Sequence, residues 1–102
     1  MKALLVCFAG MSTSIMVNKI NEAAKKKGVD LSVDAVPLSD LEDNLEGIQV
    51  ILLGPQVRYA LPNVQKITNG KVPVQVINTV DYGMMKGEKV LDQIIKLVGS
   101  QP

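Results

Sequence analysis

The residues best suited to chemistry lie near the start of the chain, where an apolar run ends at the only cysteine. Residues 3–6 are apolar and uncharged, which predicts a strand buried on both faces, with Cys7 at its carboxyl end. Glycine and hydroxyl residues follow, and Thr13 and Ser14 are predicted to cap a helix that runs to Lys27. A thiol held between a strand and a helix N-terminus is a candidate nucleophile.

The short loop after this cysteine is predicted to bind an anion. A strand, a tight loop and a helix N-terminus bring unpaired N–H donors and the positive end of the helix dipole to one place. Such donors favour the ionised form of a thiol, and they can also bind the oxygens of a phosphoryl group on its sulfur. The residues predicted to line this phosphate loop are Phe8, Ala9, Gly10, Met11, Ser12, Thr13 and Ser14.

An inert core thiol is the alternative for Cys7. Cysteine is among the most buried residue types, and a lone one that ends an apolar strand is usually structural. A core thiol, however, does not require a glycine and three hydroxyl residues directly after it, and Gly10 and residues 12–14 supply both. The loop therefore favours a functional thiol.

The composition excludes several other kinds of site. The 102 residues include 11 Lys and Arg against 10 Asp and Glu, and a net charge of +1 gives no broad field for nucleic acid or an acidic membrane. The chain has no histidine, so the commonest general base and metal ligand is missing, and one cysteine cannot build a recognisable zinc site. No apolar run approaches the roughly 20 residues of a membrane span. We therefore expect a cytoplasmic protein that uses neither metal nor cofactor.

Apolar and capping patterns predict the remaining elements. Further strands are expected over residues 29–37, 48–53 and 72–77, the first of them an edge strand in which apolar and polar residues alternate. Further helices are expected over residues 39–47, 60–69 and 86–98. Short links and right-handed crossovers then give one α/β domain over residues 1–102. Its sheet has four parallel strands in the order 2-1-3-4 with helices on both faces, a flavodoxin-like arrangement with a phosphatase-like loop.

The ligand site of such a sheet is expected at the carboxyl edge, where the strand order reverses. That point lies beside the first strand and therefore at Cys7. Residues 54–59 (GPQVRY) turn sharply at the same edge, so Arg58 and Tyr59 come near the thiol. These two are either partner contacts or ordinary residues of a helix start, and Met84 and Met85 are assigned to the core or the sheet edge. The residues considered for partner docking are Pro55, Gln56, Arg58, Tyr59 and Tyr82.

Three separated motifs carry a family resemblance that covers essentially the whole chain. They are Cys7 with residues 8–14, residues 52–59 (LLGPQVRY) and residues 81–84 (DYGM). In this order they resemble the IIB component of the lactose/cellobiose (chitobiose) family of the bacterial sugar phosphotransferase system. The resemblance also implies that Gly10 and residues 11–14 line the phosphate loop.

The resemblance implies a phosphotransferase that works through S-phosphocysteine. Cys7 takes a phosphoryl group from a phosphohistidine on the IIA component and passes it to a β-linked disaccharide bound by the membrane IIC component. The protein is then expected in the cytoplasm and transiently at the inner face of the membrane. The disaccharide, of the cellobiose, lactose or chitobiose type, is chosen by IIC and is not identified by this chain.

The loop also resembles the Cys-x5-Arg-Ser loop of low-molecular-weight protein tyrosine phosphatases, but Thr13 stands where the arginine would fall. A phosphatase needs that arginine to clamp the phosphate and an aspartic acid to protonate the leaving group. A phosphocarrier must instead keep water from its intermediate. Hydrolysis is the weaker prediction, and a phosphatase-like or other anion-binding thiol protein is the alternative.

Three other functions fit the fold less well. A redox thiol lacks a second cysteine, so any disulfide has to join two molecules. A flavin or nucleotide module has only two tyrosines to cover a ring system. A receiver domain requires an aspartate after the third strand, where Leu53 and Gly54 stand.

Overall fold

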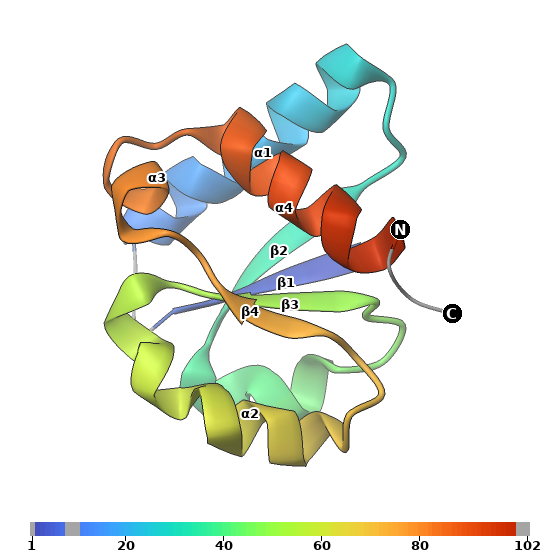
Figure 1. Cartoon of the computed structure of the whole chain (residues 1–102), viewed down its shortest axis with the longest axis vertical. Helices are drawn as coiled ribbons and strands as arrows, with labels where there is room; N and C mark the ends of the chain where they lie inside the picture. Colours follow the sequence, from blue (N-terminus) through green and yellow to red (C-terminus); the bar gives the residue numbers. More distant parts are fainter. Residues whose placement is uncertain (1, 8–10, 100–102) are drawn as a thin grey trace.

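The computed structural model describes residues 2–7 and 11–99, with the side chains of residues 11–13 excepted. Its strands are β1 (Lys2–Cys7), β2 (Ser32–Pro37), β3 (Val50–Leu53) and β4 (Val74–Val76). Its α-helices are α1 (Met11–Lys27), α2 (Leu61–Thr68), α3 (Thr79–Gly83) and α4 (Gly87–Gly99), and two 3-10 helices are η1 (Leu38–Asn44) and η2 (Pro55–Ala60). Figure 1 shows the four strands between two groups of helices.

The strands form one parallel sheet in the order β2-β1-β3-β4, which confirms the predicted topology. β1 is central because its residues pair on both sides; Ala3, for example, lies opposite Val33 of β2 and Val50 of β3. A central strand of this kind is covered on both faces, which explains the uncharged run from Ala3 to Val6. The switch in strand order therefore falls at the carboxyl end of β1, beside Cys7.

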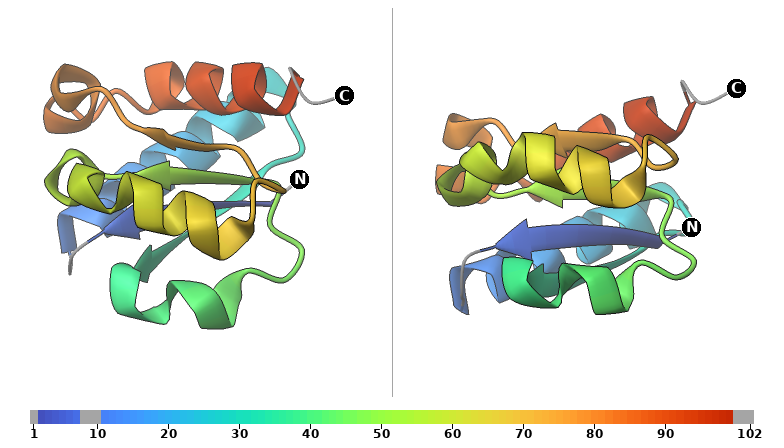
Figure 2. Two further views of the ribbon diagram at one scale, coloured as in Figure 1. Left: turned by 60° about the horizontal axis from the view of Figure 1, so that its bottom comes forward. Right: turned by 90° about the horizontal axis from the view of Figure 1, so that it is seen from below.

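The helices form two layers, one on each face of the sheet, as Figure 2 shows. Each layer packs on the sheet through its own hydrophobic cluster. The first cluster joins alternate residues of β1, such as Leu5, to Met16 and Ile20 of α1 and to Leu91 of α4. The second joins the other residues of β1 to η1, η2 and α2, with Leu41, Val57 and Val64 among its members. The two layers are referred to below as the α1/α4 layer and the α2 layer.

The α1/α4 layer contains a close helix contact at Gly87. A Cβ atom at this position would lie 2.7 Å from the backbone carbonyl oxygen of Lys19. Since only glycine leaves that space open, α4 can begin directly against α1. None of the helices in the described part of the chain has the length and apolar character needed to cross a bilayer.

Several element boundaries differ from the sequence predictions. α1 begins at Met11, so Thr13 and Ser14 lie within its first turn and are not its caps. The edge strand β2 begins only at Ser32, and its alternation fails at Ala35, which is exposed because an edge position is covered on fewer sides. Residues 38–44 form a 3-10 helix that buries only Leu41.

The carboxyl half of the chain also contains elements that the sequence analysis did not separate. η2 is a 3-10 segment before α2 that begins at Pro55, and Val57, with φ −117°, is a non-helical residue within it. α3 is a five-residue helix capped by Asn78, and it lies in what was expected to be a connection between strand and helix. Both additional elements follow the carboxyl end of a strand, so both lie at the edge where the site is expected.

Candidate functional site

Cys7 closes β1 and is 3% exposed. Its thiol donates a hydrogen bond to the backbone carbonyl of Val36, with Sγ and O 3.7 Å apart, and its Cα pairs with Pro37 in the neighbouring strand. A nucleophilic sulfur has to give up this bond and its proton before it reacts. Burial by itself fits both an inert and a functional thiol, so the neighbouring elements have to distinguish the two.

The first such element is the N-terminus of α1, which begins at Met11, only four positions after Cys7. The first four amide groups of an α-helix have no partner within the helix and point out of its N-terminus. The predicted phosphate-loop residues Met11, Ser12, Thr13 and Ser14 therefore contribute helix amides. The other three, Phe8, Ala9 and Gly10, lie outside the described residues.

The second element is the turn after β3. The N–H of Gly54 donates to the carbonyl of Val6 at 2.9 Å, which continues the pairing of β1 and β3 to the residue before Cys7. Val57 is fully buried in the core of the α2 layer and fixes η2 at this edge. The predicted docking residues of this segment lie on the surface: Pro55 is half-buried, and Gln56, Arg58 and Tyr59 are exposed.

The third element is α3, which follows β4. The N–H of Ile77 donates to the carbonyl of Leu53 at 2.9 Å, so β4 reaches the same edge as β3. Asn78 then caps α3, since its Oδ1 accepts hydrogen bonds from the amides of Val80 (2.8 Å) and Asp81 (3.2 Å). An Asn cap of this kind supports a helix too short to form by itself.

The structure brings two of the predicted docking residues into contact. Nε2 of Gln56 donates to the hydroxyl of Tyr82 over 3.3 Å, and this contact links η2 to α3. The sequence analysis named both residues but gave no reason to expect them together. The sequence predicted that both residues lie at the carboxyl edge of the sheet, but it did not predict that their side chains are in contact.

Large apolar side chains are exposed around the carboxyl ends of β1, β3 and β4. Tyr59 is 65% exposed, Val80 60% and Met84 64%, while Ile15 of α1 is 51% exposed. Large exposed apolar side chains at one edge of a domain are typical of protein interaction sites. We call these four residues the carboxyl-edge apolar set. The assignment of Met84 to the core is wrong because its side chain is exposed, whereas Met85 packs against the core of the α1/α4 layer. Val80 and Met84 are four residues apart, and the sequence already showed that helical spacing.

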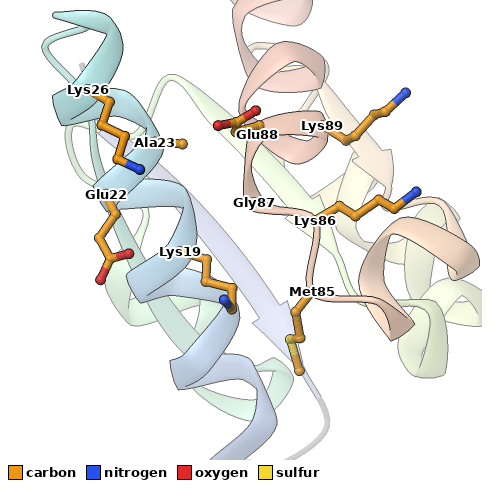
Figure 3. Close-up of a pocket in the computed structure, with 9 residues that line it drawn as sticks. All are labelled: Lys19, Glu22, Ala23, Lys26, Met85, Lys86, Gly87, Glu88 and Lys89. Atoms are coloured by element: carbon orange, nitrogen blue, oxygen red, sulfur yellow. The ribbon is translucent and has the colours of Figure 1, made fainter.

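The described surface also has clefts, one of which reaches this edge, where Val76, Asn78 and Asp81 contribute to its lining. A cleft of about 400 Å³ lies between α1 and the start of α4. Figure 3 shows Lys19 and Lys26 on one side of it and Glu88 on the other, with Lys86 and Lys89 directed away from α1. Among the described residues, no three His, Cys, Asp or Glu side chains gather as metal ligands.

Comparison with known proteins assigns the family. Residues 2–93 match the model of the family described as "PTS system, Lactose/Cellobiose specific IIB subunit". The galactose-specific EIIB component of the PTS system of Lactococcus lactis subsp. cremoris (strain MG1363) is 43% identical over 93 residues, which cover 85% of this chain and 86% of that protein. The lactose-specific EIICB component of Lacticaseibacillus casei is 29% identical over 76 residues, which are 74% of this chain but 13% of that protein.

A solved structure agrees with this assignment. The solution structure of the cellobiose-specific phosphotransferase IIB component protein from Borrelia burgdorferi is 41% identical in sequence. It covers 97% of this chain and 92% of its own, with a TM-score of 0.79. The matched sequences and the shared fold confirm the resemblance inferred from the motifs. The chain therefore belongs to the lactose/cellobiose-specific IIB family of the sugar phosphotransferase system (PTS), a family of phosphotransferases.

Proposed function

We propose that residues 1–102 form one phosphotransfer domain in which Cys7 carries the phosphoryl group. The observation that supports this role best is the position of the thiol at the carboxyl end of the central strand, four positions before α1 begins. A helix N-terminus both stabilises a thiolate and binds the oxygens of a phosphoryl group. No histidine competes for the phosphoryl group anywhere in the chain.

The transfer consists of two in-line displacements at phosphorus. In the first, the thiolate of Cys7 forms the S–P bond while the P–N bond to a phosphohistidine of IIA breaks. In the second, a hydroxyl of a disaccharide bound by IIC forms the O–P bond, the S–P bond breaks to release the Cys7 thiolate, and the proton of the sugar hydroxyl passes to that thiolate or to solvent. The residues proposed to hold the phosphoryl oxygens are Phe8, Ala9, Gly10, Met11, Ser12, Thr13 and Ser14, through backbone amides and the three hydroxyls.

Onward transfer is favoured over hydrolysis at this site. The family assignment supports a relay in which the group leaves for another acceptor. Thr13 occupies the position at which the phosphatase loop has its arginine, so the charged clamp on the phosphate is missing. The resulting proposal needs neither a metal ion nor a cofactor, because the loop and helix donors carry the electrostatic part of the transfer.

The carboxyl-edge apolar set is proposed as the docking surface for both protein partners. Its members lie on, or directly after, the segments that follow β1, β3 and β4, and the docking residues Pro55, Gln56, Arg58, Tyr59 and Tyr82 belong to the same edge. Apolar and aromatic side chains with an arginine beside them are typical of interface centres. One face then serves IIA and IIC in turn, since each has to reach the same sulfur atom.

The names of the relatives bear on the acceptor, which is the sugar bound by IIC. The L. casei relative is named as an EIICB component, and its name joins IIC with IIB in one chain. We therefore propose that this chain works in the cytoplasm and meets IIC at the inner face of the membrane. The names of relatives of about equal identity specify galactose in one case and cellobiose in the other, so the family assignment leaves the sugar open.

A chase experiment tests this function. The chain is phosphorylated by phosphorylated IIA, separated from it, and mixed with vesicles that contain IIC, with cellobiose, lactose, chitobiose or no sugar. We expect the phosphoryl group to leave the chain rapidly only with IIC and one disaccharide present, and to be recovered as sugar phosphate. Rapid release of inorganic phosphate without IIC would instead identify a phosphatase.

A further inference from the structure

The two segments that flank the proposed docking surface belong to different layers of the protein. η2 is anchored in the α2 layer through Val57 and Ala60, which are both buried there. α3 is attached to the α1/α4 layer, against whose core Tyr82 packs. Figure 2 shows these segments on opposite sides of the sheet, near the carboxyl ends of its strands. The sheet fixes where the two segments begin, since the N–H of Ile77 donates to the carbonyl of Leu53 at 2.9 Å, but beyond these residues the segments enter different layers.

The hydrogen bond between Gln56 and Tyr82 bridges this separation. The bond spans 3.3 Å and joins residues 26 positions apart. Each partner is held by its own backbone: the residue after Gln56 donates to the carbonyl of Gly54 at 3.0 Å, and the N–H of Tyr82 donates to the carbonyl of Asn78 at 2.9 Å. The bond therefore connects two segments that are locally ordered but belong to separate cores.

Gly54 leaves room for this connection. A Cβ atom at position 54 would lie 2.6 Å from Oε1 of Gln56, because the Gln56 side chain folds back over the glycine. The φ of Gly54 is −61°, which any residue adopts, so the backbone does not demand glycine there. The absent side chain is what lets Gln56 reach Tyr82.

We propose that Gln56 and Tyr82 are positioning residues that hold η2 and α3 at a fixed separation across the edge that contains Cys7. The inference deepens the proposed function, on which it rests for the identity of the partner. With the bond formed, Tyr59 on η2 and Val80 on α3 form one preorganised surface for phosphorylated IIA. Without it, each segment keeps its fold but moves independently, so docking has to order the pair at the expense of affinity.

The bond is partly exposed, and exposed hydrogen bonds contribute little to global stability. We therefore expect the effect to appear in docking and in local dynamics. Tyr82→Phe removes only the hydroxyl and keeps the ring packing, and Gln56→Ala removes the other partner. Each should raise the KM for phosphorylated IIA roughly three- to tenfold, the range of one ordinary hydrogen bond, with kcat nearly unchanged.

Three further variants separate positioning from direct contact. The double variant Gln56→Ala/Tyr82→Phe should raise KM no more than the worse single variant, because both remove the same link. Gly54→Ala should act like Gln56→Ala, since the added methyl displaces the Gln56 side chain. Gln49→Ala is the matched control: it breaks an exposed 3.2 Å bond from the N–H of Lys2 at the amino ends of the strands, and it should leave KM unchanged.

Hydrogen exchange on the isolated chain gives a readout that does not depend on the function. Tyr82→Phe should speed amide exchange in residues 55–60, on the other layer, and Gln56→Ala should speed it in residues 79–83. Gln56→Glu should restore slow exchange in both segments, because the carboxylate accepts a hydrogen bond from the Tyr82 hydroxyl. Unchanged exchange across the layers, or additive KM effects in the double variant, would overturn the proposal. A wild-type chain that accepts no phosphoryl group would overturn the proposed function alone, since the exchange result stands without it.

Discussion

The connections at the carboxyl ends of the strands differ from those at the amino ends in what they expose. Segments that follow the carboxyl ends hold Tyr59, Val80 and Met84 in solvent. Connections that lead into the amino ends contain four residues of positive φ, namely Gly28, Gly47, Asn69 and Gly70, which end one element and reverse the chain. The other described residue of positive φ is Met85, between α3 and α4. One end of the sheet thus carries large exposed apolar side chains, and most of the positive-φ turn residues lie at the other end.

This difference indicates how a small α/β domain divides its tasks. The turn residues satisfy backbone geometry, and the protein tolerates few alternatives there. The side chains at the carboxyl edge satisfy no internal packing requirement, so their apolar character is explained by a partner that covers them. Substitutions at the carboxyl edge should therefore change transfer without changing stability, and substitutions at the amino-end turns should do the reverse.

Among surface substitutions, the largest effect is expected from a charge placed in the carboxyl-edge apolar set. The double variant Val80→Asp/Met84→Asp should reduce kcat/KM for transfer from phosphorylated IIA by at least tenfold, since it puts carboxylates into an interface that excludes water. Its melting temperature should stay close to that of wild type, because both side chains are exposed. Ile95→Asp is the control, because Ile95 is 38% exposed and belongs to the second half of α4. Figure 1 shows that half of the helix towards the amino ends of the strands. Equal losses of kcat/KM in both variants would contradict the distinction between the carboxyl and amino ends of the sheet.

A smaller effect is expected at Arg58, an exposed residue of η2. Arg58→Ala should slow transfer from IIA roughly two- to threefold, as is usual for a charge at the rim of an interface, and more so at low salt. Lys66→Ala, which removes an exposed cation from the last turn of α2, should leave the rate unchanged. If the two variants transfer equally fast with both partners, Arg58 is only a surface residue of a helix start.

Gly28→Ala tests the turns that lead into the amino ends of the strands, and it should leave the rate of transfer unchanged. Gly28 ends α1 with φ +70°, where a side chain is strained although no atom lies within 4 Å of the added Cβ. The cost should be about 1–2 kcal/mol, a fall in melting temperature of roughly 4–8 °C for each kcal/mol. Gly28→Asn should lose less, since Asn tolerates this conformation. Thermal unfolding and transfer rates are measured on the same samples. A Gly28→Ala chain that keeps its melting temperature but transfers more slowly would contradict the prediction.

The topology could be predicted from the sequence because the two central strands, β1 and β3, are buried on both faces and therefore stand out as uncharged runs. The edge strands were predicted with less accurate bounds, since β4 spans only three residues and the apolar alternation of β2 breaks at Ala35. α3 was missed because five residues are too few to show a helical period, although Asn78 is a residue type that favours a cap.

The sequence predicted where the candidate site lies, but not which side chains are in contact there. Strand order alone brings Cys7, Gly54 and Asn78 to one edge, so the edge could be named from the sequence. The start of α1 was placed too late, because Thr13 and Ser14 are good capping residues and nothing local rules them out. The bond between Gln56 and Tyr82 depends on how two layers come together, and no sequence pattern records that. The roles of all seven loop residues, Phe8 to Ser14, remain predictions from the loop composition.

The central claim is that Cys7 is the phosphorylated residue, and intact mass spectrometry tests it most directly. Wild type and Cys7→Ser are each incubated with phosphorylated IIA and measured over the same time course. The account predicts that wild type gains the mass of one phosphoryl group and that Cys7→Ser gains none at a comparable rate, because serine keeps the shape but is a far weaker nucleophile at neutral pH. A Cys7→Ser chain that acquires the group as fast as wild type would contradict it.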